Sequence, residues 1–124
     1  MLFDKDLLEE QLSQNCDQST REIYRFLANA KLPRSMTVRP SQHGYISREL
    51  HFEVGGKWYF SAVLNQSWVL WYFRRPLLAN LKTEPEELLE LFPASEITGC
   101  REVKLRITNQ ATADAVCEWL CQHY

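Results

Sequence analysis

Hydrophobic residues in the first thirty positions recur every three or four residues, which is the spacing of one face of an α-helix. The spacing begins at Leu8 and Leu12. After a polar stretch, the positions that continue it are Ile23, Phe26, Leu27 and Ala30. Ser19 and Glu22 have the spacing of a capping box, so we expect a helix to restart near Ser19 and to end at Pro33.

From Met36 onward the hydrophobic period changes from 3.6 to 2, which indicates β-strands. The residues expected on the core face are Ile46, Leu50, Phe52 and Val54. The residues expected on the solvated face are Tyr45, Ser47, Glu49, His51 and Glu53. Gly55 and Gly56 then turn the chain into a second aromatic strand. This segment therefore predicts a β-hairpin.

The length of the hairpin loop decides which face each aromatic side chain occupies, because a slip of one residue exchanges the two faces. A two-residue loop would place Trp58 and Phe60 on the polar face. A three-residue loop over residues 55–57 pairs Val54 with Trp58, Phe52 with Phe60, and Leu50 with Ala62. We therefore predict the three-residue loop, with a glycine in the left-handed bulge position.

The segment from Trp68 to Phe73 is an unbroken apolar strand. A strand that is apolar on both faces is usually covered on both, here by a helix on one side and by another layer, a subunit or a ligand on the other. Arg74 and Arg75 end the strand, and Pro76 is tolerated only at a strand end or edge. This strand is the first indication of a partner.

The last third of the chain predicts a helix, a strand and a final helix. Thr83 and Glu86 form a second capping-box spacing before a leucine-rich helix that Pro93 stops. The strand from Cys100 to Ile107 alternates apolar and polar residues, and Thr108 or Asn109 caps the last helix. The prediction is one α+β domain over residues 1–124. Its antiparallel sheet combines hairpins from Tyr45 to Arg75 with this later strand, packed against N-terminal, middle and C-terminal helices.

The stretch from Gly55 to Glu90 resembles the YjbR family of small bacterial α+β domains. The residues that carry the resemblance are Gly55, Gly56, Lys57, Leu81, Lys82, Pro85, Glu86, Leu88 and Leu89, together with the aromatics after Lys57. It implies an antiparallel sheet flanked by helices and a role in DNA binding. The chain lacks the family's Asn-Lys-x-His-Trp stretch before the last strand, so no catalytic residue is carried over.

Charge is distributed unevenly along a chain whose formal net charge is -2. The segment from 23 to 82 holds nine basic residues against two acidic ones, whereas the segments on either side are acidic. Such asymmetry can mark an anionic partner, or the segments can neutralise one another in the fold. We favour neutralisation, because the domain lacks the basic balance of a dedicated nucleic-acid binder.

Candidate chemistry is sparse. Cys117 and Cys121 share a predicted helical stripe with Ala113, Val116, Leu120 and Tyr124, so we expect both thiols in the core. His51, His43, His123 and Cys100 lack metal-ligand spacing, and we expect no metal and no cofactor. His51 is expected to be solvated on its sheet face. No apolar run approaches the roughly 20 residues of a membrane span, and the N-terminus lacks a signal-peptide pattern, so a cytoplasmic protein with no membrane partner is expected.

We hypothesise a non-enzymatic binding domain that forms a homodimer through its aromatic sheet region, where a small molecule or another protein is also compatible. The candidate binding residues are Trp68, Trp71, Tyr72, Arg74 and Arg75. One alternative is a nucleic-acid module in which the two arginines hold phosphates and the aromatics stack bases. The second is an enzyme that uses the titratable row Glu49, His51 and Glu53.

Overall fold

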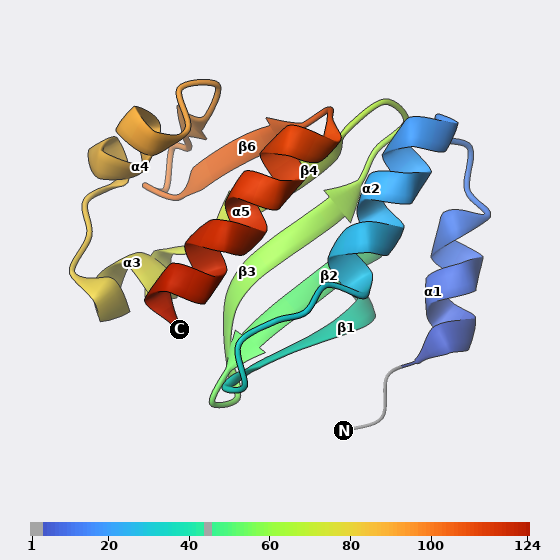
Figure 1. The fold of residues 1–124 in the computed structure, drawn as a ribbon, viewed down its shortest axis with the longest axis horizontal. Coiled ribbons are helices and arrows are strands. Elements are labelled where there is room, and N and C mark those ends of the chain that lie inside the picture. The colour runs from blue at the N-terminus through green and yellow to red at the C-terminus, as the bar shows by residue number, and fades with distance from the viewer. Residues whose placement is uncertain (1–3, 44–45) are drawn as a thin grey trace.

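The computed structural model describes residues 4–43 and 46–124, and it shows an α+β fold built on one antiparallel sheet (Figure 1). The strands are β1 (Met36–His43), β2 (Ile46–Val54), β3 (Lys57–Leu64), β4 (Val69–Phe73), β5 (Glu96–Ile97) and β6 (Val103–Ile107). The helices are α1 (Lys5–Leu12), α2 (Gln18–Ala28), α3 (Arg75–Leu81), α4 (Pro85–Leu91) and α5 (Gln110–His123). This confirms the predicted fold class. The strand order is β1-β2-β3-β4-β6-β5.

The helices gather on one side of the sheet. In Figure 1, α2 and α5 lie over the sheet, α1 lies beside α2, and α3 and α4 lie on the side of α5 away from α2. None of the helices in the described ranges is both long and apolar enough to cross a membrane. The sequence predicts that the sheet starts at Tyr45, which lies outside the described residues. It also assigns faces to Ile46 and Ser47, whose side chains lie outside the described ones.

The core between sheet and helices is aromatic. Phe60 is fully buried, and its ring centroid lies 5.5 Å from that of Trp71 and 6.0 Å from those of Phe73 and Trp119. Phe52 pairs with Phe60 across β2 and β3 and is also fully buried. The predicted sharing of the core face by Phe52 and Phe60 is therefore confirmed.

The loop between β2 and β3 differs from the predicted one, although Phe52 still pairs with Phe60. Gly55 and Gly56 have φ values of 59° and 81°, which is the two-residue turn favoured by the twist of a hairpin. Val54 therefore pairs with Lys57, and the predicted pairing of Val54 with Trp58 is wrong. A bulge next to Tyr59 then restores Phe60 to the core, so Trp58 lies on the face opposite the helices.

Two of the predicted helix caps are displaced. Helix α2 begins at Gln18 after Asp17, whose backbone N–H donates to Gln66 O at 2.7 Å, so a tertiary contact and not a Ser19 capping box fixes the start. Helix α4 has its capping box at Glu84 and Glu87, one residue after the predicted one. The predicted Asn109 cap of α5 is confirmed by its acceptance of the Thr112 N–H.

The prediction that Cys117 and Cys121 on α5 both lie in the core is wrong. Ala113, Val116 and Leu120 are buried, but Cys117 is half-buried and Cys121 is exposed. The helix is rotated so that Trp119, which is 6 % exposed, reaches Phe60 and Phe73. The larger aromatic side chain buries more apolar surface than a thiol, which explains the rotation.

Alkaline pH should destabilise the fold. Burial, and next the Glu49 carboxylate, raises the pKa of Tyr24 well above its ordinary value of 10.0, while burial raises the pKa of Tyr124 to about 12 and that of Cys117 to about 11. The unfolded chain loses these protons first, so the stabilisation is complete below about pH 9 and is lost as pH rises through the folded-state values. Urea unfolding between about pH 8 and 11 checks this, and Tyr24→Phe should flatten the decline. A stability independent of pH over this range would contradict it.

Candidate functional site

The sheet face opposite the helices, here called the open face, presents two cross-strand rows. The first row comprises Glu49, Val63, Leu70 and Arg106, one each from β2, β3, β4 and β6. The second comprises His51, Ser61, Tyr72 and Lys104 from the same strands. Because side chains alternate between faces along a strand, these positions project away from the buried Leu50, Ala62, Trp71 and Leu105.

A groove of about 400 Å³ lies on the open face. The residues that line it are Glu49, Trp58, Ser61, Val63, Asn65, Leu70, Tyr72, Arg74 and Glu102. No helix residue of the described chain is among them. The groove combines apolar walls from Val63 and Leu70 with aromatic rings and carboxylates, a composition typical of binding sites.

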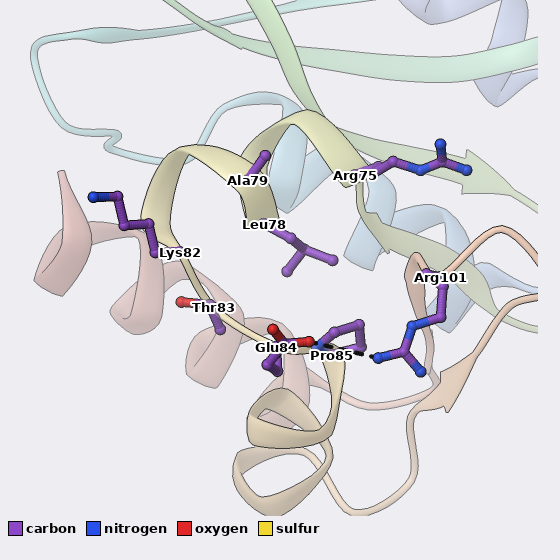
Figure 2. Close-up of a pocket in the computed structure, with 8 residues that line it drawn as sticks. All are labelled: Arg75, Leu78, Ala79, Lys82, Thr83, Glu84, Pro85 and Arg101. Atoms are coloured by element: carbon purple, nitrogen blue, oxygen red, sulfur yellow. Dashed lines mark ion pairs between the residues drawn. The ribbon is translucent and has the colours of Figure 1, made fainter.

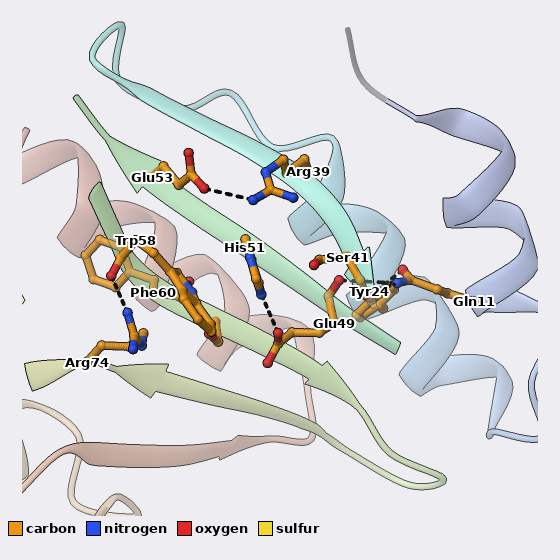
Figure 3. Close-up of polar contacts among 11 residues, drawn as sticks. Gln11, Tyr24, Arg39, Ser41, Glu49, His51, Glu53, Trp58, Phe60 and Arg74 are labelled. Carbon is orange, nitrogen blue, oxygen red and sulfur yellow. Dashed lines mark hydrogen bonds and ion pairs between the residues drawn. The ribbon is translucent and has the colours of Figure 1, made fainter. Parts of the chain in front are cut away.

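Trp58 forms one end of this groove, between two other side chains (Figure 3). The His51 ring stacks on it with centroids 3.9 Å apart, and the Arg74 guanidinium lies 3.7 Å from the indole centroid. Arg74 also donates to Trp58 O at 2.6 Å, while the indole N–H donates to Ser61 Oγ at 2.9 Å. The bulge that moves Trp58 to this face thereby builds a rigid stack.

Glu49 and His51 form a buried pair beneath that stack. Their side chains are only 5% and 7% exposed, and His51 Nε2 contacts Glu49 Oε1 (Figure 3). The predicted solvated His51 is therefore wrong, because the indole of Trp58 covers the imidazole. The Glu49 backbone is held from the helix side, where Gln11 Nε2 donates to Glu49 O at 3.2 Å and Tyr24 donates to Gln11 Oε1 at 2.7 Å.

The open face carries charged side chains toward both of its sides. Glu49 and Glu53 lie on β2, and Glu53 accepts a 3.1 Å ion pair from Arg39 on β1. Lys104 and Arg106 lie on β6. Between them, burial raises the pKa of Tyr72, and the Glu102 and Glu49 carboxylates raise it further. Arg39 neutralises Glu53, and Glu96 pairs with Lys104 at 3.6 Å, so the unlike charges at the two ends of the first row are Glu49 on β2 and Arg106 on β6.

The structure separates the sequence-predicted binding residues. Tyr72 and Arg74 line the groove, and Trp68 lies beside the first row, where the Arg106 guanidinium is 4.3 Å from its ring centroid. Trp71 is fully buried against Phe60 on the helix side. Its prediction as a contact residue is wrong, because alternation along β4 places Tyr72 outward and Trp71 inward.

Arg75 also lies away from the open-face groove. Its guanidinium donates to Cys100 O at 2.9 Å, and it lines a second hollow of about 330 Å³ between α3 and α4 (Figure 2). The cations there do not converge. Arg101 is paired with Glu86 at 2.9 Å, and the side chain of Lys82 points away from Arg101 (Figure 2). This hollow does not form an anion site.

Sequence patterns missed the principal groove residues. The sequence predicts Trp58 in the core, and it does not single out Ser61, Val63 or Leu70 as binding residues. Within the described chain, no group of three or more potential metal ligands comes together. The one signal available was the two-glycine turn, which fixes a two-residue loop and requires a bulge if Phe60 is to be buried.

No known protein family, curated protein or solved structure matches this chain. The resemblance of Gly55 to Glu90 to the YjbR family therefore stays a prediction.

Proposed function

We propose that this chain is a non-enzymatic interaction domain that self-associates through the open face of its sheet. The observation that carries the proposal is the groove, in which Val63, Leu70 and Tyr72 are only half-buried although they lie at the centre of the sheet. Central strands of a sheet are usually covered on both faces when both faces carry apolar side chains. A second copy of the domain would complete that cover.

The sheet edges favour association through the face over association through strand addition. The edge strand β1 carries Pro40, which lacks an N–H for pairing with an added strand. The other edge strand, β5, has only two residues. Short or proline-containing edges protect against edge-to-edge pairing. The first row of the face also carries opposite charges at its two ends, Glu49 and Arg106, so one copy can complement another.

A binding role is favoured over catalysis by how the titratable side chains are used. Glu49 and His51 contact each other beneath Trp58, and Glu53 pairs with Arg39. Ser61 Oγ accepts the indole N–H of Trp58. Each candidate catalytic side chain thus has a structural partner within the chain. Its presence is explained without a catalytic role.

A nucleic-acid role is less favoured by the groove. Arg74 is stacked on Trp58, and Arg75 binds Cys100 O away from the groove, so the two cations do not present one phosphate-binding surface. Glu49 and Glu102 in the groove repel phosphate. This role is retained as an outcome of the test below.

Sedimentation equilibrium should show a wild-type dimer at tens of micromolar protein. Leu70→Glu, which adds a carboxylate to the apolar centre of the face between Val63 and Arg106, should weaken dimerisation by about 100-fold or more. Leu91→Glu is the matched control, because Leu91 is an apolar side chain 61% exposed on α4. It should leave the dimer intact.

A wild-type monomer at high micromolar concentration would contradict self-association, as would equal loss in both variants. Sub-micromolar, salt-sensitive binding of a short single-stranded oligonucleotide, lost in Arg74→Ala/Arg75→Ala, would favour the nucleic-acid alternative.

A further inference from the structure

The first row of the open face has opposite charges at its two ends, Glu49 and Arg106, and apolar side chains between them, and from this we infer which side chains meet across the dimer. We propose that a two-fold axis runs parallel to the strands between β3 and β4, so that Arg106 of each copy enters the groove of the other and contacts Glu49. This inference rests on the proposed self-association. It adds the symmetry and the pair of residues that specifies it.

The strand order fixes what such an axis brings together. A two-fold axis parallel to the strands and between β3 and β4 exchanges β3 with β4 and β2 with β6. Each residue of a cross-strand row then faces a residue of the same row in the second copy. In the first row, Val63 therefore faces Leu70 of the second copy, and Glu49 faces Arg106 of the second copy.

The charges select this axis over the other two-fold axis that packs the same faces. An axis perpendicular to the strands would place β2 on β2 and β6 on β6. Glu49 and Glu53 would then meet the same acids of the second copy, and Lys104 and Arg106 would meet the same bases. Like charges facing each other across an interface are destabilising. The parallel axis instead places Glu49 against Arg106 of the second copy.

Sheet twist leaves this contact within reach. Stacked sheets are rotated by about 30° from each other, and a strand one and a half spacings from the axis lies about 7 Å from it. The rotation therefore moves Glu49 of one copy and Arg106 of the other about 4 Å out of direct opposition. A flexible arginine side chain can span this distance. Glu53 would approach Glu102 of the second copy closer to the strand ends. The rotation separates facing side chains further there. Glu53 is also neutralised by Arg39.

Glu49 has the features of a carboxylate that receives a donor through the groove. It is buried, it lines the groove, and His51 is its only hydrogen-bond donor among the described side chains. Figure 3 shows the carboxylate pointing away from Gln11 and the helices. Arg106 is exposed, and among the described side chains it stacks on Trp68, so its guanidinium can turn toward a second copy.

Two neutral variants and their mixture test this pairing. Glu49→Gln and Arg106→Gln should each weaken the homodimer by about tenfold or more, because each homodimer loses both symmetric contacts. A heterodimer of the two variants keeps one intact Glu49–Arg106 contact. Native mass spectrometry of an equal mixture should therefore show heterodimer well above the statistical half of all dimers.

Lys104→Gln is the matched control, because Lys104 is the next outward position on β6 and pairs with Glu96 of its own chain at 3.6 Å. It should change dimer affinity less than Arg106→Gln. Circular dichroism and urea unfolding identify any variant that fails to fold, and Arg106→Gln, at an exposed position, keeps the test decisive. A wild-type dimer insensitive to Arg106→Gln, or a statistical mixture, would overturn the pairing and leave self-association standing. A monomeric wild type would overturn both.

Discussion

Replacing Phe60 with alanine should lower the free energy of unfolding by about 3–5 kcal/mol. Phe60 is fully buried, and its ring contacts those of Trp71, Phe73 and Trp119. Removing the ring loses its transfer free energy and leaves a cavity that a β-strand flanked by two others cannot close. Urea unfolding at one fixed protein concentration measures the change, because the stability of a dimer depends on concentration.

The control is Leu91→Ala, which truncates an exposed leucine outside the core and should cost less than about 0.5 kcal/mol. A loss below about 1 kcal/mol for Phe60→Ala would mean that Phe60 does not occupy the centre of the core.

The core register of the hairpin could be predicted because burial of aromatic side chains outweighs the local conformation of a loop. Phe52 and Phe60 share a face in every arrangement that buries both. The loop itself could not be predicted by the same rule, since a two-residue glycine turn followed by a bulge also buries both rings. The position of Trp58, which closes one end of the groove, depends on that difference.

Helix faces were less predictable where residues of different size competed for the same stripe. Cys117 and Cys121 fit the spacing of Val116 and Leu120, yet Trp119 takes the place at the core. The 3.6-residue period constrains which residues are neighbours on a helix surface, but the rotation of the helix is decided by what lies across from it. Here Phe60 and Phe73 decide it.

The candidate site was predictable in location but not in composition. The sequence pointed to the aromatic strands, and the groove lies there. Arg74 and Arg75 are adjacent in sequence, but β4 ends at Phe73 and α3 begins at Arg75, so their side chains diverge. His51 is covered by Trp58, and the Glu49 backbone is held by Gln11, 38 residues away in the sequence. No local pattern contains those contacts.

Replacing His51 with phenylalanine should destabilise the fold by about 3 kcal/mol although it keeps an aromatic ring beneath Trp58. His51 Nε2 contacts Glu49, whose side chain is only 5% exposed. Loss of that donor leaves a carboxylate buried without a partner from its own chain, and breaking a buried pair by removing one member costs about 3–5 kcal/mol. Packing against Trp58 is preserved, so the loss reports the polar contact.

The double variant His51→Phe/Glu49→Gln separates the two contributions. Neutralising Glu49 removes the buried charge, so it should restore about 1–3 kcal/mol in the His51→Phe background while costing stability in the wild type. Urea unfolding of all four proteins completes the cycle, measured below the dissociation constant of the dimer so that association does not contribute. Equal effects of Glu49→Gln in both backgrounds would show that the carboxylate does not depend on His51.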